Sequence, residues 1–403
     1  MTAALDADVV VVGAGIVGLA AARAVQRRRG GRVLVLDKAD AVATHQTGRN
    51  SGVVHSGLYY RPGSAKATLV ATGRARLERY CHERDLSYDR CGKVVVATNA
   101  HELRALDELA RRGAANGVEV QRIGPSGLHE REPRVAGLAA LAVPSTAITD
   151  YGAVASSLAD DLVAEGGELR TGVEVLDLSA ASRGEVVVAH VGGEVRARWL
   201  LNCAGLHSDR VAAMAGADTG VSIVPFRGEY HELVPSARHL VRHLVYPVPD
   251  PRWPFLGVHM TRMVDGSVHV GPNAVLALGR EAYDGGIDPH DALALARDPG
   301  LRRLAARYWR TGATELLRSR SERLLLADVR RLLPDVGAAD LRPAGAGIRA
   351  QALDRDGTLL DDFAFATSPR AVHVLNAPSP AATASLAIAE VIADRLGRLV
   401  EAT

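Results

Sequence analysis

Cysteine and lysine are scarce in this sequence, and long apolar runs are absent. The three cysteines, Cys81, Cys91 and Cys203, are too few and too scattered for a disulfide framework or a CxxC metal site. No stretch of about 18 uninterrupted apolar residues is present, so we expect no segment that spans a membrane. The N-terminus has no basic segment before its first apolar run, which argues against a signal peptide. These absences predict a cytoplasmic protein, with peripheral contact to a membrane left open.

An excess of charge of either sign is also missing. The 48 basic and 46 acidic residues leave a formal net charge of +2, which gives no electrostatic reason to expect nucleic acid as a partner. We also expect no metal site, because the 14 histidines and three cysteines are not grouped as they are in zinc or iron sites. Apolar residues, by contrast, make up 47% of the 403 residues, which is enough to bury two cores.

The first forty residues have the pattern of a strand, a glycine-rich turn, a helix and a second strand. Residues 8–12 (DVVVV) form a β-branched run typical of a strand buried on both faces. Residues 13–18 (GAGIVG) follow directly and open an Ala-rich helix, and residues 33–36 (VLVL) predict the second strand, which ends at Asp37. A GxGxxG motif in this context predicts a dinucleotide site. A glycine-rich turn without a ligand is the alternative.

The residues of this motif have separate physical tasks. Gly13 permits the tight turn, Gly15 lets the backbone approach a pyrophosphate, and Gly18 lets the helix pack closely on the strand. The N-terminus of the helix offers free N–H groups and the positive end of its dipole to the phosphates. The Asp37 carboxylate accepts hydrogen bonds from ribose hydroxyls and repels a 2′-phosphate, which disfavours NADP. The motif does not distinguish FAD from NAD.

The remaining sequence alternates between helical and strand patterns. Helices are expected at 65–84, 101–116, from 151, across 289–333 and at 381–398, and strands at 92–98, 169–175 and 372–375. Residues 185–203 predict a hairpin with its turn at 192–193, and residues 221–270 a strand-rich region. The sum is an α/β protein, in which a Rossmann-like nucleotide-binding domain is assembled from non-contiguous pieces around an inserted, mostly antiparallel β-sheet with helices. We assign residues 1-80, 150-215 and 340-403 to the first domain, and residues 81-149 and 216-339 to the inserted, substrate-binding domain.

Longer motifs carry a more specific signal than GxGxxG. Residues 45–60 (HQTGRNSGVVHSGLYY) closely resemble a segment of the L-2-hydroxyglutarate oxidase/dehydrogenase family. Further matching strings are residues 225–230, 246–250, 254–259, 271–277, 347–352 and 376–383. Together the matches extend over roughly residues 8–395. This family belongs to the D-amino-acid oxidase group of FAD-dependent oxidoreductases, so the resemblance implies a D-amino-acid oxidase-like fold.

The resemblance implies non-covalent FAD and the oxidation of L-2-hydroxyglutarate to 2-oxoglutarate by hydride transfer from C2 to flavin N5. It places residues 45–60, which we call the flavin segment, under the isoalloxazine. It also places the N-terminus of the last helix at the pyrimidine end, where the helix dipole stabilises the charge of reduced flavin. The glycine motif and the resemblance together give the expected cofactor-binding residues: Gly13, Gly15, Ile16, Val17, Gly18, Asp37, Lys38, Thr47, Asn50, Ser51, Gly52, Val175, Cys203, Ala204, Gly205, Gly347, Arg349, Pro378, Ser379, Ala381, Ala382 and Thr383.

Oxidation of a 2-hydroxy acid needs a base for the hydroxyl proton and cations for the carboxylates. His55 is the expected base, because it lies in the flavin segment and imidazole titrates near neutral pH; a structural role for His55 is the alternative. His259, in a strand of the inserted domain, is the second candidate. Arg349 stands in a Gly-x-Arg element that resembles the carboxylate clamp of the D-amino-acid oxidase group, so we expect it to bind a substrate carboxylate bidentately. The candidate donors for the second carboxylate are Tyr60, Arg227, Thr261 and Arg262.

Two positions depart from the family pattern. Gly152 stands where the family has a basic residue, and His231 stands where we expect an aromatic or aliphatic residue. The alternative function is therefore oxidation of another hydroxy or amino acid. The alternative class is an NAD-binding dehydrogenase or a non-catalytic nucleotide-binding module, against which the second flavin-facing segment at 376–385 argues. The expected partners are a small 2-hydroxy dicarboxylate and an electron acceptor, either oxygen or a quinone or other respiratory carrier.

Overall fold

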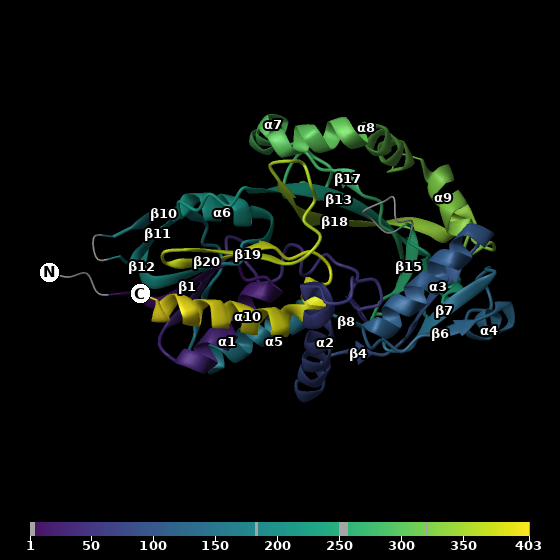
Figure 1. Ribbon diagram of the computed structural model, residues 1–403, viewed down its shortest axis with the longest axis horizontal. Coiled ribbons are helices and arrows are strands. Elements are labelled where there is room, and N and C mark those ends of the chain that lie inside the picture. The colour runs from purple at the N-terminus through teal and green to yellow at the C-terminus, as the bar shows by residue number, and fades with distance from the viewer. Residues whose placement is uncertain (1–4, 182–183, 250–256, 320, 403) are drawn as a thin grey trace.

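The computed structural model describes residues 5–181, 184–249, 257–319 and 321–402. Its strands form two large sheets, which lie side by side along the long axis in Figure 1, and one small sheet. Asp250 and residues 254–256, which belong to two of the matching strings, lie outside the described residues. None of the helices in the described ranges is long and apolar enough to cross a membrane.

The first sheet has a parallel core with the order β20, β12, β1, β2, β9. Antiparallel β11 and β10 extend it from β12, and β19 pairs antiparallel with β20. The strand bounds are β1 Ala7–Val12, β2 Val33–Leu36, β9 Glu168–Arg170, β10 Val175–Ala180, β11 Val186–His190, β12 Gly193–Asn202, β19 Ala364–Ser368 and β20 Ala371–Asn376. The single strand expected at 169–175 is wrong: Gly172, with φ +69°, separates β9 from β10, and the two lie at different positions in the sheet.

Both faces of β1 are buried, as its sequence predicts. Val9 and Val11 pack into a core shared with α1, α5 and α10, whereas Val10 and Val12 belong to a core on the other face that includes Val211 of α6. Figure 1 shows α1, α5 and α10 below this sheet and α6 above it. The helices of this half are α1 Ile16–Arg29, α2 Ala65–Glu83, α5 Tyr151–Ala164, α6 Ser208–Met214, α10 Ala381–Glu401 and the short 3₁₀ turn η1 Gly205–His207.

The second sheet is mostly antiparallel, with the order β17, β13, β16, β15, β14, β5, β7, β6, and β18 pairs with β13. Only the β14–β5 pair is parallel among the described strand pairs of this sheet. The strands are β5 Lys93–Ala97, β6 Gln121–Ile123, β7 Ala139–Val143, β13 Val221–Leu233, β14 Leu244–Pro247, β15 His259–Arg262, β16 Val268–Gly271, β17 Val275–Leu276 and β18 Leu341–Asp354. The helices around it are α3 Ala100–Ala115, α4 Pro125–Arg131, α7 Pro289–Arg297, α8 Pro299–Ser319, α9 Glu322–Arg330, η2 Pro235–Leu240 and η3 Ala338–Asp340.

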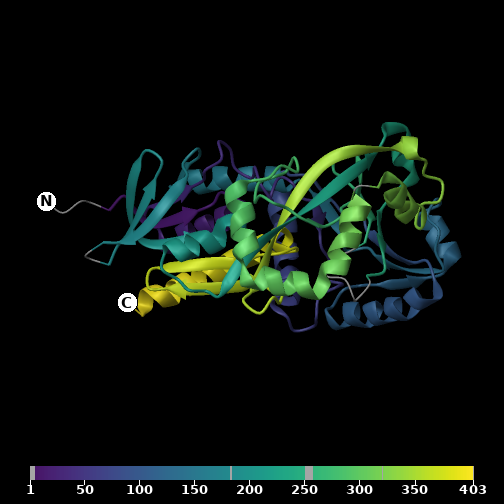
Figure 2. The ribbon, with the colours of Figure 1, turned by 90° about the horizontal axis from the view of Figure 1, so that it is seen from above.

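The long pair β13–β18 connects the middle of the molecule with its far end. Its register runs from Val221 opposite Asp354 to Leu233 opposite Leu341, and Figure 2 shows both strands crossing from the centre into the right half. The sequence of β18 (LRPAGAGIRAQALD) has few β-formers and gave no strand prediction. Pairing along almost the whole of β13 overrides that weak local preference.

The small sheet joins three distant segments in the order β3 Val53–Val54, β8 Ala147–Thr149, β4 Tyr88–Asp89. β3 ends immediately before His55, and β8 ends one residue before the start of α5 at Tyr151. The two strands run antiparallel, with Val53 opposite Ile148 and Val54 opposite Ala147, so it is Val53, two residues before His55, that meets α5: the Tyr151 hydroxyl donates to its carbonyl (3.1 Å).

Gly73 of α2 lies where this helix packs against the start of α10. A Cβ at Gly73 would lie 2.6 Å from Cα of Ala384 and 2.9 Å from the carbonyl oxygen of Thr383, so the helices cannot keep their separation with an alanine there. We expect Gly73→Ala to lower the free energy of unfolding by about 1–3 kcal/mol, the usual cost of overpacking. The matched control is Gly397→Ala in α10, where a Cβ meets nothing within 4 Å and helix propensity favours alanine by up to about 1 kcal/mol. Denaturant midpoints that move in the same direction for both variants would contradict this account.

Candidate active site

A cavity of about 1160 Å³ lies where the two halves of the protein meet. Its walls are the start of α1, the flavin segment, residues 203–211, the middle of β18 and the start of α10. Pockets for single small ligands measure roughly 300–1,000 Å³, so this cavity has room for a dinucleotide together with a small substrate.

The three glycines of the GxGxxG motif separate into packing glycines and a ligand-facing glycine. A Cβ at Gly13 would lie 2.5 Å from the carbonyl oxygen of Cys203, and a Cβ at Gly18 would lie 1.9 Å from that of Gly13. A Cβ at Gly15 would meet only Oγ1 of Thr47, at an ordinary 3.4 Å. The fold itself therefore needs Gly13 and Gly18, whereas Gly15 keeps space open in the cavity, as a pyrophosphate requires.

Asp37 holds the glycine turn as well as facing the cavity. Its carboxylate accepts the backbone N–H groups of Ala14 (2.6 Å) and Ala39 (2.8 Å). Each carboxylate oxygen has a further lone pair, so ribose hydroxyls can still be accepted at this position.

Side chains of the flavin segment tie it to the N-terminus of α1. Thr47 Oγ1 accepts the N–H of Ile16 (3.1 Å), and Asn50 Nδ2 donates to the Thr47 carbonyl (2.6 Å). Asn50 Oδ1 in turn accepts the N–H of Gly52 (2.7 Å). Gly52 does not line the cavity: its φ is +65°, and a Cβ there would lie 2.8 Å from the Thr149 carbonyl oxygen. We therefore assign Gly52 no contact with the cofactor; a glycine is needed there for the positive φ and for the close approach to Thr149.

The other expected cofactor-binding residues all line the cavity. They are Gly13, Gly15, Ile16, Val17, Gly18, Asp37, Lys38, Thr47, Asn50, Ser51, Val175, Cys203, Ala204, Gly205, Gly347, Arg349, Pro378, Ser379, Ala381, Ala382 and Thr383.

His55 lies at the end of the cavity where the flavin segment meets α10. Its backbone N–H donates to Thr383 Oγ1 (3.1 Å), and its Nε2 is 3.3 Å from Ser379 Oγ. Within the described chain, the buried Nδ1 has no hydrogen-bond partner. Burial, reinforced by the nearby positive charge of Lys93 and by other cationic groups, lowers the pKa of His55 to about 3. The imidazole is therefore neutral at physiological pH.

His259 also lines the cavity, but its hydrogen bonding differs. Its Nδ1 lies 2.8 Å from the Gly257 carbonyl oxygen and therefore carries a proton, and its ring packs against Tyr246 with centroids 4.2 Å apart. Burial lowers the pKa of His259 to about 4. Nε2 is then the basic atom of this ring.

Two of the five substrate-binding candidates line the cavity. Arg349 stands on β18 opposite Phe226. The strand passes close to the flavin segment here, because a Cβ at Gly347 would lie 2.5 Å from the carbonyl oxygen of Arg49. Tyr60 also faces the cavity, with the Lys66 ammonium 5.9 Å from its ring centroid.

Arg227, Thr261 and Arg262 do not line the cavity. The Arg227 guanidinium forms an ion pair with Glu229 and donates to the Tyr283 carbonyl (2.9 Å). Thr261 is buried in β15, and Arg262 is partly exposed, 3.8 Å from a carboxylate oxygen of Asp89. These placements correct the expectation, because Arg227 and Arg262 lie beside carboxylates of the protein itself and Thr261 is buried within the sheet.

Several cavity groups were not expected from the sequence. Lys66 is buried and ion-paired with Asp361 (2.9 Å), and Lys93 lies behind Tyr59 and Tyr246, which form part of the wall. The available signal was the scarcity of lysine, because all three lysines of the chain (Lys38, Lys66 and Lys93) lie in or beside the cavity.

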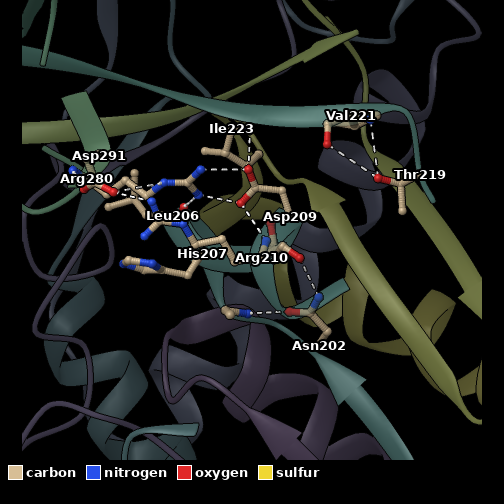
Figure 3. Close-up of polar contacts among 12 residues, drawn as sticks. Asn202, Leu206, His207, Asp209, Arg210, Thr219, Val221, Ile223, Arg280 and Asp291 are labelled. Atoms are coloured by element: carbon tan, nitrogen blue, oxygen red, sulfur yellow. Dashed lines mark hydrogen bonds and ion pairs between the residues drawn. The ribbon is translucent and has the colours of Figure 1, made fainter. Parts of the chain in front are cut away.

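The loop between β17 and α7 reaches across to the first half at the cavity rim. Glu281 forms an ion pair with Lys38 and lies 2.8 Å from His207 Nε2. The hydrogen bond with His207 and the pairing with Lys38 lower the pKa of Glu281 to about 2. Next to it, Arg280 donates through Nη2 to Asp209 (2.8 Å) beneath β13, as Figure 3 shows. The partly exposed pair Lys38–Glu281 and the buried pair Arg280–Asp209 hold the loop against η1 and α6.

Asp288, His290 and Asp291 are the one group of described residues whose ligand atoms lie close enough for a metal ion, within 4.8 Å of one another. Asp288 caps α7 by accepting the N–H of Asp291 (2.9 Å), and Asp291 is paired with Arg210. These carboxylates are already used in the fold, so the group carries no argument for a metal.

Comparisons with known proteins agree with this geometry. A sequence profile of the family described as "FAD dependent oxidoreductase" matches residues 8–395. The chain is 45% identical over 389 residues to L-2-hydroxyglutarate dehydrogenase of Indibacter alkaliphilus, covering 95% of this chain and 97% of the relative. It is 42% identical over 395 residues to the Escherichia coli K12 protein of that name (98% and 94% covered), and 41% identical over 413 residues to the human mitochondrial one (98% and 89%).

Solved structures confirm the expected fold. L-alpha-glycerophosphate oxidase from Mycoplasma pneumoniae, solved with FAD bound, superposes with a TM-score of 0.79 at 22% identity, over 98% of this chain and 94% of that one. Glycine oxidase from Geobacillus kaustophilus superposes with a TM-score of 0.73 at 19% identity, over 97% and 95%. The chain belongs to the FAD-dependent oxidoreductases with a D-amino-acid oxidase-like fold, and within them to the family of the L-2-hydroxyglutarate dehydrogenases.

Proposed function

We propose that this protein oxidises L-2-hydroxyglutarate to 2-oxoglutarate with non-covalently bound FAD. The observation that carries the proposal is a neutral His55, whose buried Nδ1 has no partner among the described residues, in a cavity that also contains Arg349. The names of relatives that are 40–45% identical support the choice of substrate.

The residues around the cavity fit FAD. The glycine turn and the N-terminus of α1 would hold the pyrophosphate, Asp37 a ribose, and the flavin segment with the start of α10 the isoalloxazine. Bound there, FAD would supply the acceptor for the hydride that leaves substrate C2. The N–H groups at the start of α10 would face the pyrimidine end and stabilise negative charge there.

We assign the base to His55. A neutral imidazole can accept the hydroxyl proton, and the unpartnered Nδ1 is available for it. His259 remains the second candidate: the proton of its Nδ1 is directed to the Gly257 carbonyl, which leaves Nε2 to accept a proton. Arg349 would bind one substrate carboxylate through the two parallel N–H groups of its guanidinium.

The alternative substrates lose the support that Gly152 and His231 gave them. Neither residue lines the cavity. Gly152 lies in the first turn of α5 and donates its N–H to Asp150 (2.8 Å), and His231 lies on β13 opposite Val270.

The division of the chain remains part of the proposal. Residues 1-80, 150-215 and 340-403 would form the FAD-binding domain, and residues 81-149 and 216-339 the substrate-binding domain. β18 lies in the last piece of the first domain but pairs with β13 of the second.

As the electron acceptor we propose a quinone or other carrier in preference to oxygen, since the curated relatives are named dehydrogenases.

Anaerobic mixing of the FAD-loaded protein with L-2-hydroxyglutarate tests the proposed function directly. We expect L-2-hydroxyglutarate to bleach the visible absorbance of the bound flavin, because hydride transfer to N5 reduces it. D-2-hydroxyglutarate should not, because its C2 hydrogen points away when the carboxylates are held in the same places. Bleaching by an amino acid and not by L-2-hydroxyglutarate would refute the proposal.

His55→Ala should keep FAD and reduce it more slowly in the same assay. The expected loss in the reduction rate is about two to four orders of magnitude, the usual contribution of a general base. His259→Ala is the comparison variant. A loss of less than tenfold in His55→Ala, together with a larger one in His259→Ala, would move the base to His259.

Arg349→Lys should weaken substrate binding although the charge is retained. An ammonium cannot form the two parallel bonds of a guanidinium, and breaking a charge-assisted pair costs about 2 kcal/mol, or roughly 30-fold in affinity. The matched control is Arg342→Lys on the same strand, where the side chain is exposed and paired with Glu232. An unchanged half-saturating concentration of L-2-hydroxyglutarate in Arg349→Lys would make Arg349 a structural residue.

A further inference from the structure

Lys93 is a lysine in an apolar core. It is the first residue of β5 (KVVVA), only 2% exposed, and the strand continues with Val94 and Val95. Burying an ammonium is costly unless something compensates for the lost water. A charged lysine at this position therefore needs a partner of opposite charge, or a hydrogen-bond acceptor, to offset the cost of burial.

The described neighbours compensate for this charge only in part. The Nζ atom lies 4.4 Å from the ring centroid of Tyr59 and 5.1 Å from that of Tyr246, within cation–π distance of both. Burial is the only cause that shifts the pKa of Lys93, and it lowers it to about 7. No carboxylate in the described part of the chain thus counters this ammonium, in contrast to Lys38, which is paired with Glu281, and Lys66 with Asp361.

The two tyrosine rings separate Lys93 from the cavity by a single layer. Tyr59 and Tyr246 both line the cavity, as do His55 and His259, whose pKa values the charge of Lys93 lowers. The Tyr59 hydroxyl is buried and has no hydrogen-bond partner within the described ranges. This part of the wall therefore offers an uncompensated positive charge and a free O–H donor, which together suit a carboxylate.

We propose that Lys93 and the Tyr59 hydroxyl form the subsite for the second carboxylate of the substrate, and that Lys93 makes the enzyme selective for dicarboxylates. The inference rests on the proposed function, which supplies the dianion. Arg349 accounts for one carboxylate, and Arg227 and Arg262 already have carboxylate partners in the protein, Glu229 and Asp89.

The subsite has a pH signature that sets Lys93 apart from its neighbours. The titratable groups that face it are His55, His259, Tyr59 and Tyr246. Burial keeps both imidazoles neutral, with pKa values of about 3 and about 4, and raises the pKa of both tyrosines. Between pH 6 and pH 9, on the order of the range accessible to the folded protein, Lys93 alone among these groups changes charge. Above pH 7 it must take up a proton to bind an anion, so affinity for a dicarboxylate should fall by up to tenfold per pH unit.

The test compares two ligands with the FAD-loaded, full-length protein. 2-Oxoglutarate carries the second carboxylate, and 2-oxopentanoate has a methyl group in its place. Equilibrium binding is followed by calorimetry in buffers of different ionisation enthalpy, which also counts protons taken up. The variants are Lys93→Met, which removes the charge, Lys93→Arg, which makes it permanent, and Arg262→Met, which removes a positive charge outside the cavity.

We expect Lys93→Met to weaken 2-oxoglutarate binding at least 30-fold at pH 6.5 and to change 2-oxopentanoate binding less than threefold. Lys93→Arg should retain the preference for the dicarboxylate and lose both the proton uptake and the decline in affinity above pH 7. Arg262→Met should behave as wild type. If Lys93→Met weakens both ligands by the same factor, or neither, the subsite is refuted.

Two further results have a defined meaning. Should Lys93→Met not yield folded holoenzyme, the pH dependence of Lys93→Arg decides, and an unchanged decline above pH 7 overturns the inference. Failure of L-2-hydroxyglutarate to bleach the wild-type flavin refutes the proposed function and this inference with it. The wild-type protein alone reveals that case, so it cannot be confused with a failure of the subsite.

Discussion

Thr383 joins the segments that form the proposed catalytic end of the cavity. Its Oγ1 accepts the backbone N–H of His55 (3.1 Å) and lies 2.9 Å from the Tyr151 hydroxyl, which donates to the Val53 carbonyl (3.1 Å). β3, α5 and α10 thus meet in one buried hydrogen-bond network, and such networks are strong when every member is satisfied. The position of His55 is therefore fixed by two helices on the first sheet and not by its own loop. The role proposed for His55 depends on this fixed point.

What the sequence could predict was local. The run of valines, the glycine turn and Asp37 interact within about forty residues, so their spacing alone was enough to predict β1, α1 and β2 and the face that each glycine presents. The long strand β18 was missed, because its glycines and alanines have little β preference and only β13 makes them a strand. The flavin segment was recognised from a long matching string, and its hydrogen bonds to Ile16 and Thr383 explain why that string has so little regular structure.

The side-chain assignments failed where the sequence does not reveal which partner a side chain has in the fold. Arg227 was a reasonable carboxylate ligand by motif position, yet Glu229 two residues along the same strand already pairs with it. Lys93 was overlooked for the opposite reason, since a lysine at the start of an apolar strand is usually at the surface. In the fold, Tyr59 of the flavin segment and Tyr246 of β14 cover its ammonium. Charge in a sequence can be counted, but whether a charge is already neutralised is a property of the fold.

The cavity couples its base to its ligand through electrostatics. In the absence of an anion, burial and the positive charges of Lys93, Lys66 and Arg349 hold the pKa of His55 low, so the imidazole is a weak base. A dianion placed between these cations and His55 cancels their effect and raises that pKa, which strengthens the base only when the substrate is present. The coupling is reciprocal, because a proton on His55 must then tighten the binding of the dianion by the same factor. A monocarboxylate carries half the charge and would therefore raise the pKa of His55 less. Selectivity for a dicarboxylate and activation of the base are in this view two consequences of one excess of buried positive charge.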